Sequence, residues 1–66
     1  MGKVYVPLQF FQTHFGFSSD ELLNALPRLY GESYAVKDTI YVPLRRFAAL
    51  LGLTVHWDGY RIHVRR

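Results

Sequence analysis

The sequence predicts an α+β fold in which a small antiparallel sheet, made of two hairpins and an N-terminal strand, packs on short helices. A strand–proline–helix phrase occurs twice, at about residues 3–17 and 39–53, which indicates a pseudo-repeat. Residues 33–42 and 54–64 each alternate apolar and polar side chains around a turn signal, as hairpins do. A leucine-containing helix is expected between the two copies, over about residues 18–27.

Composition limits the domain count and the partners. A chain of 66 residues is expected to form a single domain over residues 1–66, and it has no cysteine for a disulfide or a thiolate site. Aromatic residues make up 17% of the chain, and large rings bury much area in a small core or between two copies. The net charge of +3 fits a polyanionic partner without requiring one. No apolar run reaches the ~20 residues of a membrane helix, and the N-terminal stretch does not match a signal peptide.

The two copies of the phrase align without a gap at an offset of 36 residues. A β-branched and aromatic strand leads into a proline, which lacks the N–H that a sheet needs and suits the first turn of a helix. Pro7 and Pro43 are therefore expected to end the strands, and Gly16 and Gly52 to end the helices in the left-handed conformation. The matching residues are Tyr5 with Tyr41, Val6 with Val42, Pro7 with Pro43, Leu8 with Leu44, Phe11 with Phe47 and Gly16 with Gly52.

The helices are expected to bury one face each. The apolar stripes are Leu44, Phe47, Ala48 and Leu51 in the second copy, and Leu8, Phe11, Gln12 and Phe15 in the first. For the helix between the copies, Ser18 and Glu21 have the spacing of a capping box, and Pro27 is expected to end or kink it. Its predicted apolar face consists of Leu22, Leu23 and Leu26.

Turn signals set the expected pairing of both hairpins. Asp58-Gly59 predicts a two-residue turn with Trp57 facing Tyr60 and His56 facing Arg61. This pairing separates an apolar face, expected to pack on a helix, from a cationic face. The apolar face is Val55, Trp57, Tyr60, Ile62 and Val64, and the other is Thr54, His56, Arg61, His63 and Arg65. In the preceding hairpin, a turn at Lys37-Asp38 would place Tyr34 opposite Tyr41 and Ala35 opposite Ile40.

The second copy and the hairpin after it have the order strand, YVPLR, short helix ending in LG, strand ending in WD, turn and strand. The residues concerned are Tyr41, Val42, Pro43, Leu44, Arg45, Phe47, Leu51, Gly52, Val55, Trp57, Asp58 and Gly59. In this pattern, residues 33–65 resemble the copper amine oxidase N-terminal-like domain, also called the stalk domain, and residues 3–17 resemble it in part. The resemblance implies a non-catalytic module of secreted or surface proteins of Gram-positive-type bacteria, without copper or quinone. The leucine-rich helix after the first copy departs from the family pattern.

Five basic side chains are candidate ligand-binding residues for an anionic polymer such as a wall polymer or nucleic acid. They are Arg46, His56, Arg61, His63 and Arg65. Arg46 falls, with Arg45, in the first turn of a helix, where the dipole disfavours a cation, so Glu32, Asp38 or an anionic ligand is its expected partner. The competing interpretation of the hairpin arginines and histidines is a solvated face that discourages edge pairing.

Catalytic, metal and cofactor sites are not predicted. His56 and His63 are expected to be diagonal neighbours, but a metal usually needs a third ligand, and the neighbouring arginines would repel it. The sequence has no recognisable nucleophile–histidine–acid order, no paired carboxylates on one face and no glycine-rich phosphate loop.

The functional prediction is a non-catalytic, stalk-like accessory module, acting in assembly or in contact with wall polymers. The resemblance places it outside the cell or on its surface, although the lack of a recognisable signal peptide leaves the cytoplasm open. A homodimer through aromatic residues such as Tyr5, Phe10 and Tyr41 is a further expectation. The alternative is a small basic helix-turn-helix domain, built on LRRFAALLGLT and reading nucleic acid with the segment after Gly52, or a winged variant with the last hairpin as wing.

Overall fold

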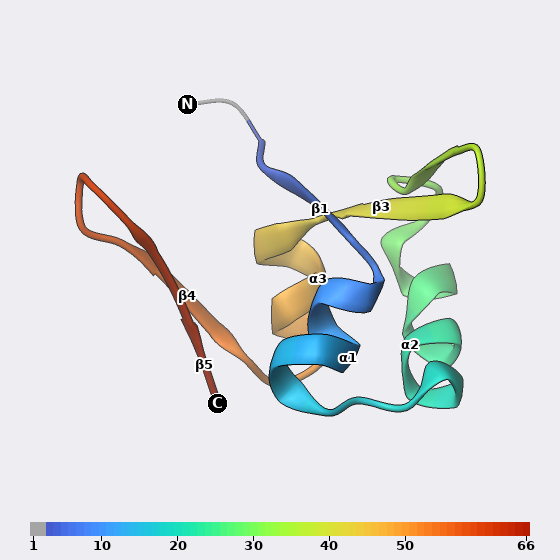
Figure 1. Cartoon of the computed structure of the whole chain (residues 1–66), viewed down its shortest axis with the longest axis horizontal. Helices are drawn as coiled ribbons and strands as arrows, with labels where there is room; N and C mark the ends of the chain where they lie inside the picture. The colour runs from blue at the N-terminus through green and yellow to red at the C-terminus, as the bar shows by residue number, and fades with distance from the viewer. Residues whose placement is uncertain (1–2) are drawn as a thin grey trace.

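A computed structural model describes residues 3–66 and confirms the α+β class (Figure 1). The strands divide between two antiparallel sheets, one of order β1-β3-β2 and the other formed by β4 and β5. The elements in chain order are β1 (Tyr5–Pro7), α1 (Gln9–Phe15), α2 (Ser19–Ala25), the 3₁₀ helix η1 (Leu26–Leu29), β2 (Tyr34–Val36), β3 (Thr39–Pro43), α3 (Leu44–Leu50), β4 (Thr54–Trp57) and β5 (Ile62–Arg65).

The two strand–proline–helix units meet through their strands. β1 and β3 pair antiparallel with Val6 opposite Val42, and each strand ends at its proline. The N–H of Leu8 donates to the carbonyl of Ile40 at 2.8 Å, and the N–H of Leu44 donates to the carbonyl of Val4 at 2.8 Å. Each bond connects the start of one helix to the strand segment of the other unit, so the two strand–proline–helix units stabilise one another.

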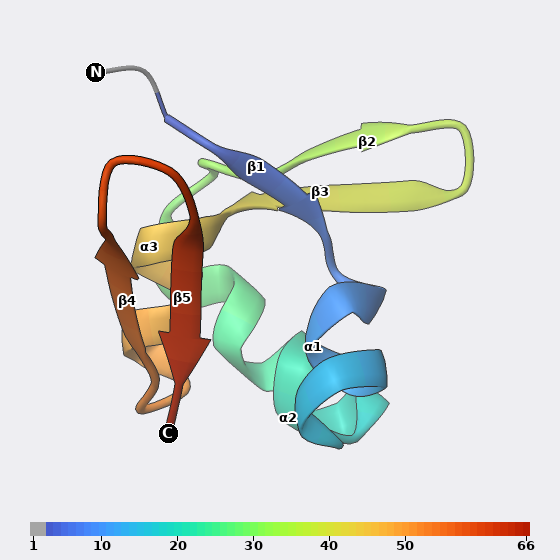
Figure 2. The ribbon, with the colours of Figure 1, turned by 60° about the vertical axis from the view of Figure 1, so that its left-hand side comes forward.

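The core lies between the three-stranded sheet and the helices (Figure 2). Phe11 of α1 and Phe47 of α3 are fully buried, and their ring centroids are 5.2 Å apart with planes inclined at 62°. This is the edge-to-face arrangement that aromatic quadrupoles favour. The buried residues are Phe11, Leu22, Ala25, Leu29, Val42, Leu44, Phe47, Ala48 and Leu53.

The middle helix begins with the expected capping box. The N–H of Ser18 donates to Glu21 Oε1 at 2.9 Å, and the N–H of Glu21 donates to Ser18 Oγ at 3.1 Å. Its apolar face differs from the prediction, because Leu23 is 52% exposed, whereas Leu22, Ala25 and Leu29 are buried. Leu23 lies about 100° around the helix axis from Leu22, and in α2 that rotation turns it toward solvent. The α-helix ends at Ala25, and Pro27 lies in η1, so the chain continues there as a tighter 3₁₀ turn.

The hairpin of β2 and β3 has the expected register, with Tyr34 opposite Tyr41 and Ala35 opposite Ile40. Lys37 takes the left-handed conformation, with φ of 56°, and so supplies the turn without a glycine. The ring of Tyr34 stacks on Tyr41 at 5.5 Å and lies 5.1 Å from that of Tyr5, between centroids. These three tyrosines form an exposed or half-exposed aromatic cluster on the sheet.

The C-terminal hairpin has a different register from the predicted one. Val55 lies opposite Val64, His56 opposite His63 and Trp57 opposite Ile62, a shift of two residues. The cause is Asp58, whose Oδ1 accepts the N–H groups of Tyr60 and Arg61, both at 2.8 Å. Asp58 therefore starts the turn, and Gly59, with φ of 98°, and Tyr60 become its central residues. Because the shift is even, the side chains of the strands keep their predicted faces.

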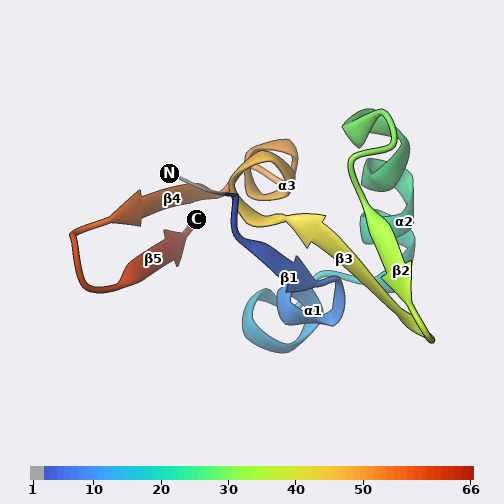
Figure 3. The same cartoon turned by 90° about the horizontal axis from the view of Figure 1, so that it is seen from above.

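The prediction that Trp57 packs inward on a helix is wrong. Trp57 is 43% exposed, Ile62 is 42% exposed and Tyr60 is 94% exposed, whereas Val55 and Val64 pack against the core. The hairpin extends past the helices, as Figure 3 shows. Helix α3 has seven residues and so spans about 10 Å, which is too short to support the hairpin as far as its turn.

Candidate functional site

The outer face of the β4–β5 hairpin carries four of the five predicted ligand-binding residues. His56 and His63 lie directly opposite one another rather than diagonally, with ring centroids 6.3 Å apart. Arg65, opposite Thr54, shares their side of the ribbon, and Arg61 follows at the turn. All are exposed. We call His56, Arg61, His63 and Arg65 the outer hairpin face.

Asp58 lies beside the outer hairpin face, although the sequence predicted only a turn there. Its Oδ2 lies 2.8 Å from His63 Nε2, while its Oδ1 holds the turn. The backbone N–H of Arg61, the side chain of His63 and the N–H of Tyr60 hold the pKa of this carboxyl well below its usual range, because each bond favours the charged form. Asp58 thus fixes the turn and orients His63 at once.

The paired imidazoles of His56 and His63 are two potential metal ligands. Across residues 3–66, no group of three or more histidine or acidic side chains is arranged to hold an ion. The carboxylate nearest to His63 already accepts hydrogen bonds through both of its oxygens.

Arg46 does not join the outer hairpin face. It forms an ion pair with Glu32, which also binds Lys3, so one carboxylate joins the N-terminal segment to the start of α3. Glu32 was one of the partners expected for Arg46, and this contact offsets the unfavourable position of a cation in the first turn of a helix. The neighbouring Arg45 reaches the carbonyl of Val55 at 3.5 Å.

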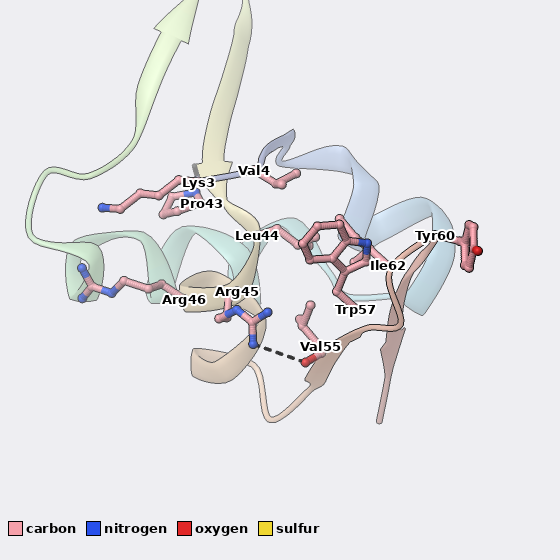
Figure 4. A pocket seen from close by; sticks show the side chains of 10 residues that line it. All are labelled: Lys3, Val4, Pro43, Leu44, Arg45, Arg46, Val55, Trp57, Tyr60 and Ile62. Atoms are coloured by element: carbon pink, nitrogen blue, oxygen red, sulfur yellow. Dashed lines mark hydrogen bonds between the residues drawn. The ribbon is translucent and has the colours of Figure 1, made fainter. Parts of the chain in front are cut away.

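Behind the outer hairpin face, a groove of about 620 Å³ lies between the inner side of the hairpin, the start of α3 and the residues before β1 (Figure 4). Sequence reasoning missed it, because it depends on how far the hairpin stands from the helices. Lys3, Arg45 and Arg46 supply its cationic rim. Its apolar wall consists of Val4, Pro43, Leu44, Val55, Trp57 and Ile62. We call this surface the inner groove.

Comparisons of the chain with protein-family models, curated proteins and solved structures found no match. No helix within residues 3–66 has the length and apolar character that crossing a bilayer requires. The outer hairpin face and the inner groove are the two candidate functional surfaces.

Acid is expected to weaken the hairpin through Asp58. Its folded pKa is depressed, so the carboxylate contributes stability above its ordinary pKa of about 4, and this contribution is lost as the pH falls below that value. Asp58→Asn should lower the stability of the protein near neutral pH. The variant should also lose less stability than the parent between about pH 5 and pH 2. Thermal melts of both proteins across this range, followed by circular dichroism, test the prediction.

The pKa of Glu21 is also lowered, by its hydrogen bonds to Ser18. Asp58→Asn leaves these bonds unchanged, so Glu21 contributes equally to the pH dependence of stability in both proteins. Parallel acid profiles for the parent and Asp58→Asn would contradict the role assigned to Asp58.

Proposed function

We propose that this chain is a non-catalytic module, like the stalk domains that its sequence resembles, belonging to a surface or secreted protein of a Gram-positive-type bacterium. In this proposal it contacts an anionic wall polymer through the outer hairpin face. The cellular location comes from the resemblance alone, whereas the contact surface is argued from the geometry.

The arrangement of charge on the hairpin is the observation that supports the proposal most directly. Two opposed imidazoles and the guanidinium groups of Arg61 and Arg65 share one side of an exposed ribbon. The only carboxylate of residues 54–65 is Asp58, so Arg61 and Arg65 leave this side of the hairpin with a net positive charge. An extended cationic face suits a repeating row of phosphates or carboxylates better than a single small anion.

Binding to purified walls tests the proposal. The double variant Arg61→Gln and Arg65→Gln should fold like the parent but sediment with teichoic-acid-containing walls about tenfold more weakly at low salt. The double variant Arg28→Gln and Lys37→Gln is the matched control, because it removes the same two positive charges from exposed side chains outside β4 and β5. It should bind like the parent. Equal losses in both variants would mean that net charge alone is being measured, and an absence of wall binding by the parent would refute the proposal.

The nucleic-acid alternative is an outcome of the same experiment. The segment after Gly52 forms β4 and β5, so no recognition helix follows that glycine, and only the winged version keeps a structural counterpart. If duplex DNA at matched salt bound the parent more tightly than teichoic acid, with the same dependence on Arg61 and Arg65, the wing assignment would replace the wall contact.

A further inference from the structure

The inner groove contains a strand edge that no other strand of residues 3–66 covers. In an antiparallel pair, residues alternate between exchanging hydrogen bonds with the partner strand and pointing their N–H and C=O outward. Asp58 donates its N–H to the carbonyl of Arg61, so these two residues are hydrogen-bonded partners across the hairpin. By the alternation, the N–H and C=O groups of Trp57 and Val55 point outward from the ribbon. The carbonyl of Val55 points accordingly to Arg45, away from β5 (Figure 4).

The edge is available to a partner strand. Within residues 3–66, β4 and β5 form a sheet of two strands, and β4 has β5 as its only neighbour. The bond from Arg45 to the carbonyl of Val55 is long, at 3.5 Å, and the guanidinium is exposed, so a peptide could displace it at small cost. Two-stranded ribbons are only marginally stable in water, and a third strand would reinforce this one.

Apolar side chains line the same groove without being covered. Val4 is 47% exposed, Trp57 is 43% exposed and Ile62 is 42% exposed, and all three line the inner groove. They come from the N-terminal segment and from both strands of the hairpin, so the fold brings them together. A large apolar side chain placed among them would remove area from water on both partners.

The charges of the groove determine what kind of peptide fits. Lys3, Arg45 and Arg46 contribute three positive charges, and Glu32, which pairs with Lys3 and Arg46, contributes one negative charge, leaving two positive charges. A partner with carboxylates beside its apolar residue would complement this rim, whereas a basic partner would be repelled.

From these observations we propose that the inner groove binds an extended acidic and apolar peptide segment of a partner protein, which adds as a third strand along the free edge of β4. Main-chain hydrogen bonds to Val55 and Trp57 would hold the strand, as in other cases of strand addition. One apolar side chain would enter between Trp57 and Val4, and a flanking carboxylate would meet Arg45. The proposal concerns the opposite side of the hairpin from the wall contact and does not depend on it.

Trp57 provides a direct readout, because it is the only tryptophan of the chain and lines the groove. The probe is the peptide acetyl-Glu-Val-Glu-Ile-Glu-Thr-amide, titrated into the full chain while tryptophan emission is recorded. Saturable binding with a blue shift is expected. An analogue with lysine in place of each glutamate, and one with N-methylated alternate amides that cannot form the ladder, should each bind at least about tenfold more weakly.

Variants then separate the groove from the rest of the surface. Arg45→Gln and Ile62→Ala should each weaken the acidic peptide about five- to tenfold, after melting curves show that both proteins fold. Arg65→Gln, on the outer hairpin face, should leave the affinity unchanged, although it belongs to the wall-binding test, so the two proposals can fail separately.

Three results would overturn the peptide site. These are an unchanged emission spectrum at millimolar peptide, equal affinity for the acidic and basic peptides, and equal affinity for the N-methylated analogue. If tryptophan emission instead shifts to the blue as the protein concentration is raised without peptide, and Ile62→Ala abolishes this shift, the groove would be assigned to a second copy of this chain.

Discussion

Replacing Phe47 with alanine is expected to unfold most of the protein at room temperature. The side chain is fully buried and packs against the ring of Phe11, which is also fully buried. Removing such a ring costs about 3–5 kcal/mol through lost transfer energy and the cavity that remains. A domain of this size rarely has more than about 3–5 kcal/mol in total, so the loss is comparable with the whole stability.

Far-UV circular dichroism during urea denaturation measures this effect. Phe47→Leu, which keeps much of the volume, should retain a cooperative transition at a lower midpoint. Tyr60→Ala is the aromatic control, because Tyr60 is 94% exposed, and it should melt close to the parent. A cooperative transition in Phe47→Ala at the parent's midpoint would show that the two rings do not form the centre of the core.

Leu29→Ala should have the second largest effect, with a loss of about 2–5 kcal/mol. Leu29 is fully buried at the end of η1, where the 3₁₀ turn after Pro27 brings it against the core. The cavity cannot close easily, because Tyr30 and Gly31 both follow with positive φ and hold the chain in a tight reversal.

Leu23→Ala is the matched control for Leu29, since it is the same substitution in the preceding helix. Leu23 is 52% exposed, and its loss should be within about 0.5 kcal/mol. Thermal and urea denaturation of the two variants side by side measures the difference. Equal losses at the two positions would mean that the buried face of α2 and η1 has been assigned incorrectly.

The elements were predictable from the sequence because their signals are local. The strand ends at Pro7 and Pro43 follow from the missing N–H of proline, and the capping box follows from Ser18 and Glu21 at their fixed spacing. The residues of Asp58-Gly59 correctly indicated a hairpin. They did not give its register, because the aspartate can start the turn through its side chain as well as occupy its centre.

The candidate site was less predictable because it depends on packing between distant segments. Strict alternation correctly assigned the outer hairpin face, even though the register was shifted by two. Alternation also placed Trp57 and Ile62 on the apolar face of the hairpin. It does not indicate whether a helix extends far enough to cover them, and both are partly exposed. Glu32 was among the partners expected for Arg46, but its second contact, with Lys3, joins residues 29 positions apart, and no local pattern contains that information.

The reciprocal bonding of β1 and β3 has a consequence for synthesis on the ribosome. Val4 and Leu8 find their backbone partners only at Leu44 and Ile40, so the first third of the chain cannot complete its sheet until residue 44 has left the exit tunnel. Until then, nascent Tyr5 to Phe15 would remain an uncovered aromatic stretch, of the kind that chaperones bind. Folding should therefore be a late, all-at-once event governed by closure of this long loop rather than by growth from the N-terminus.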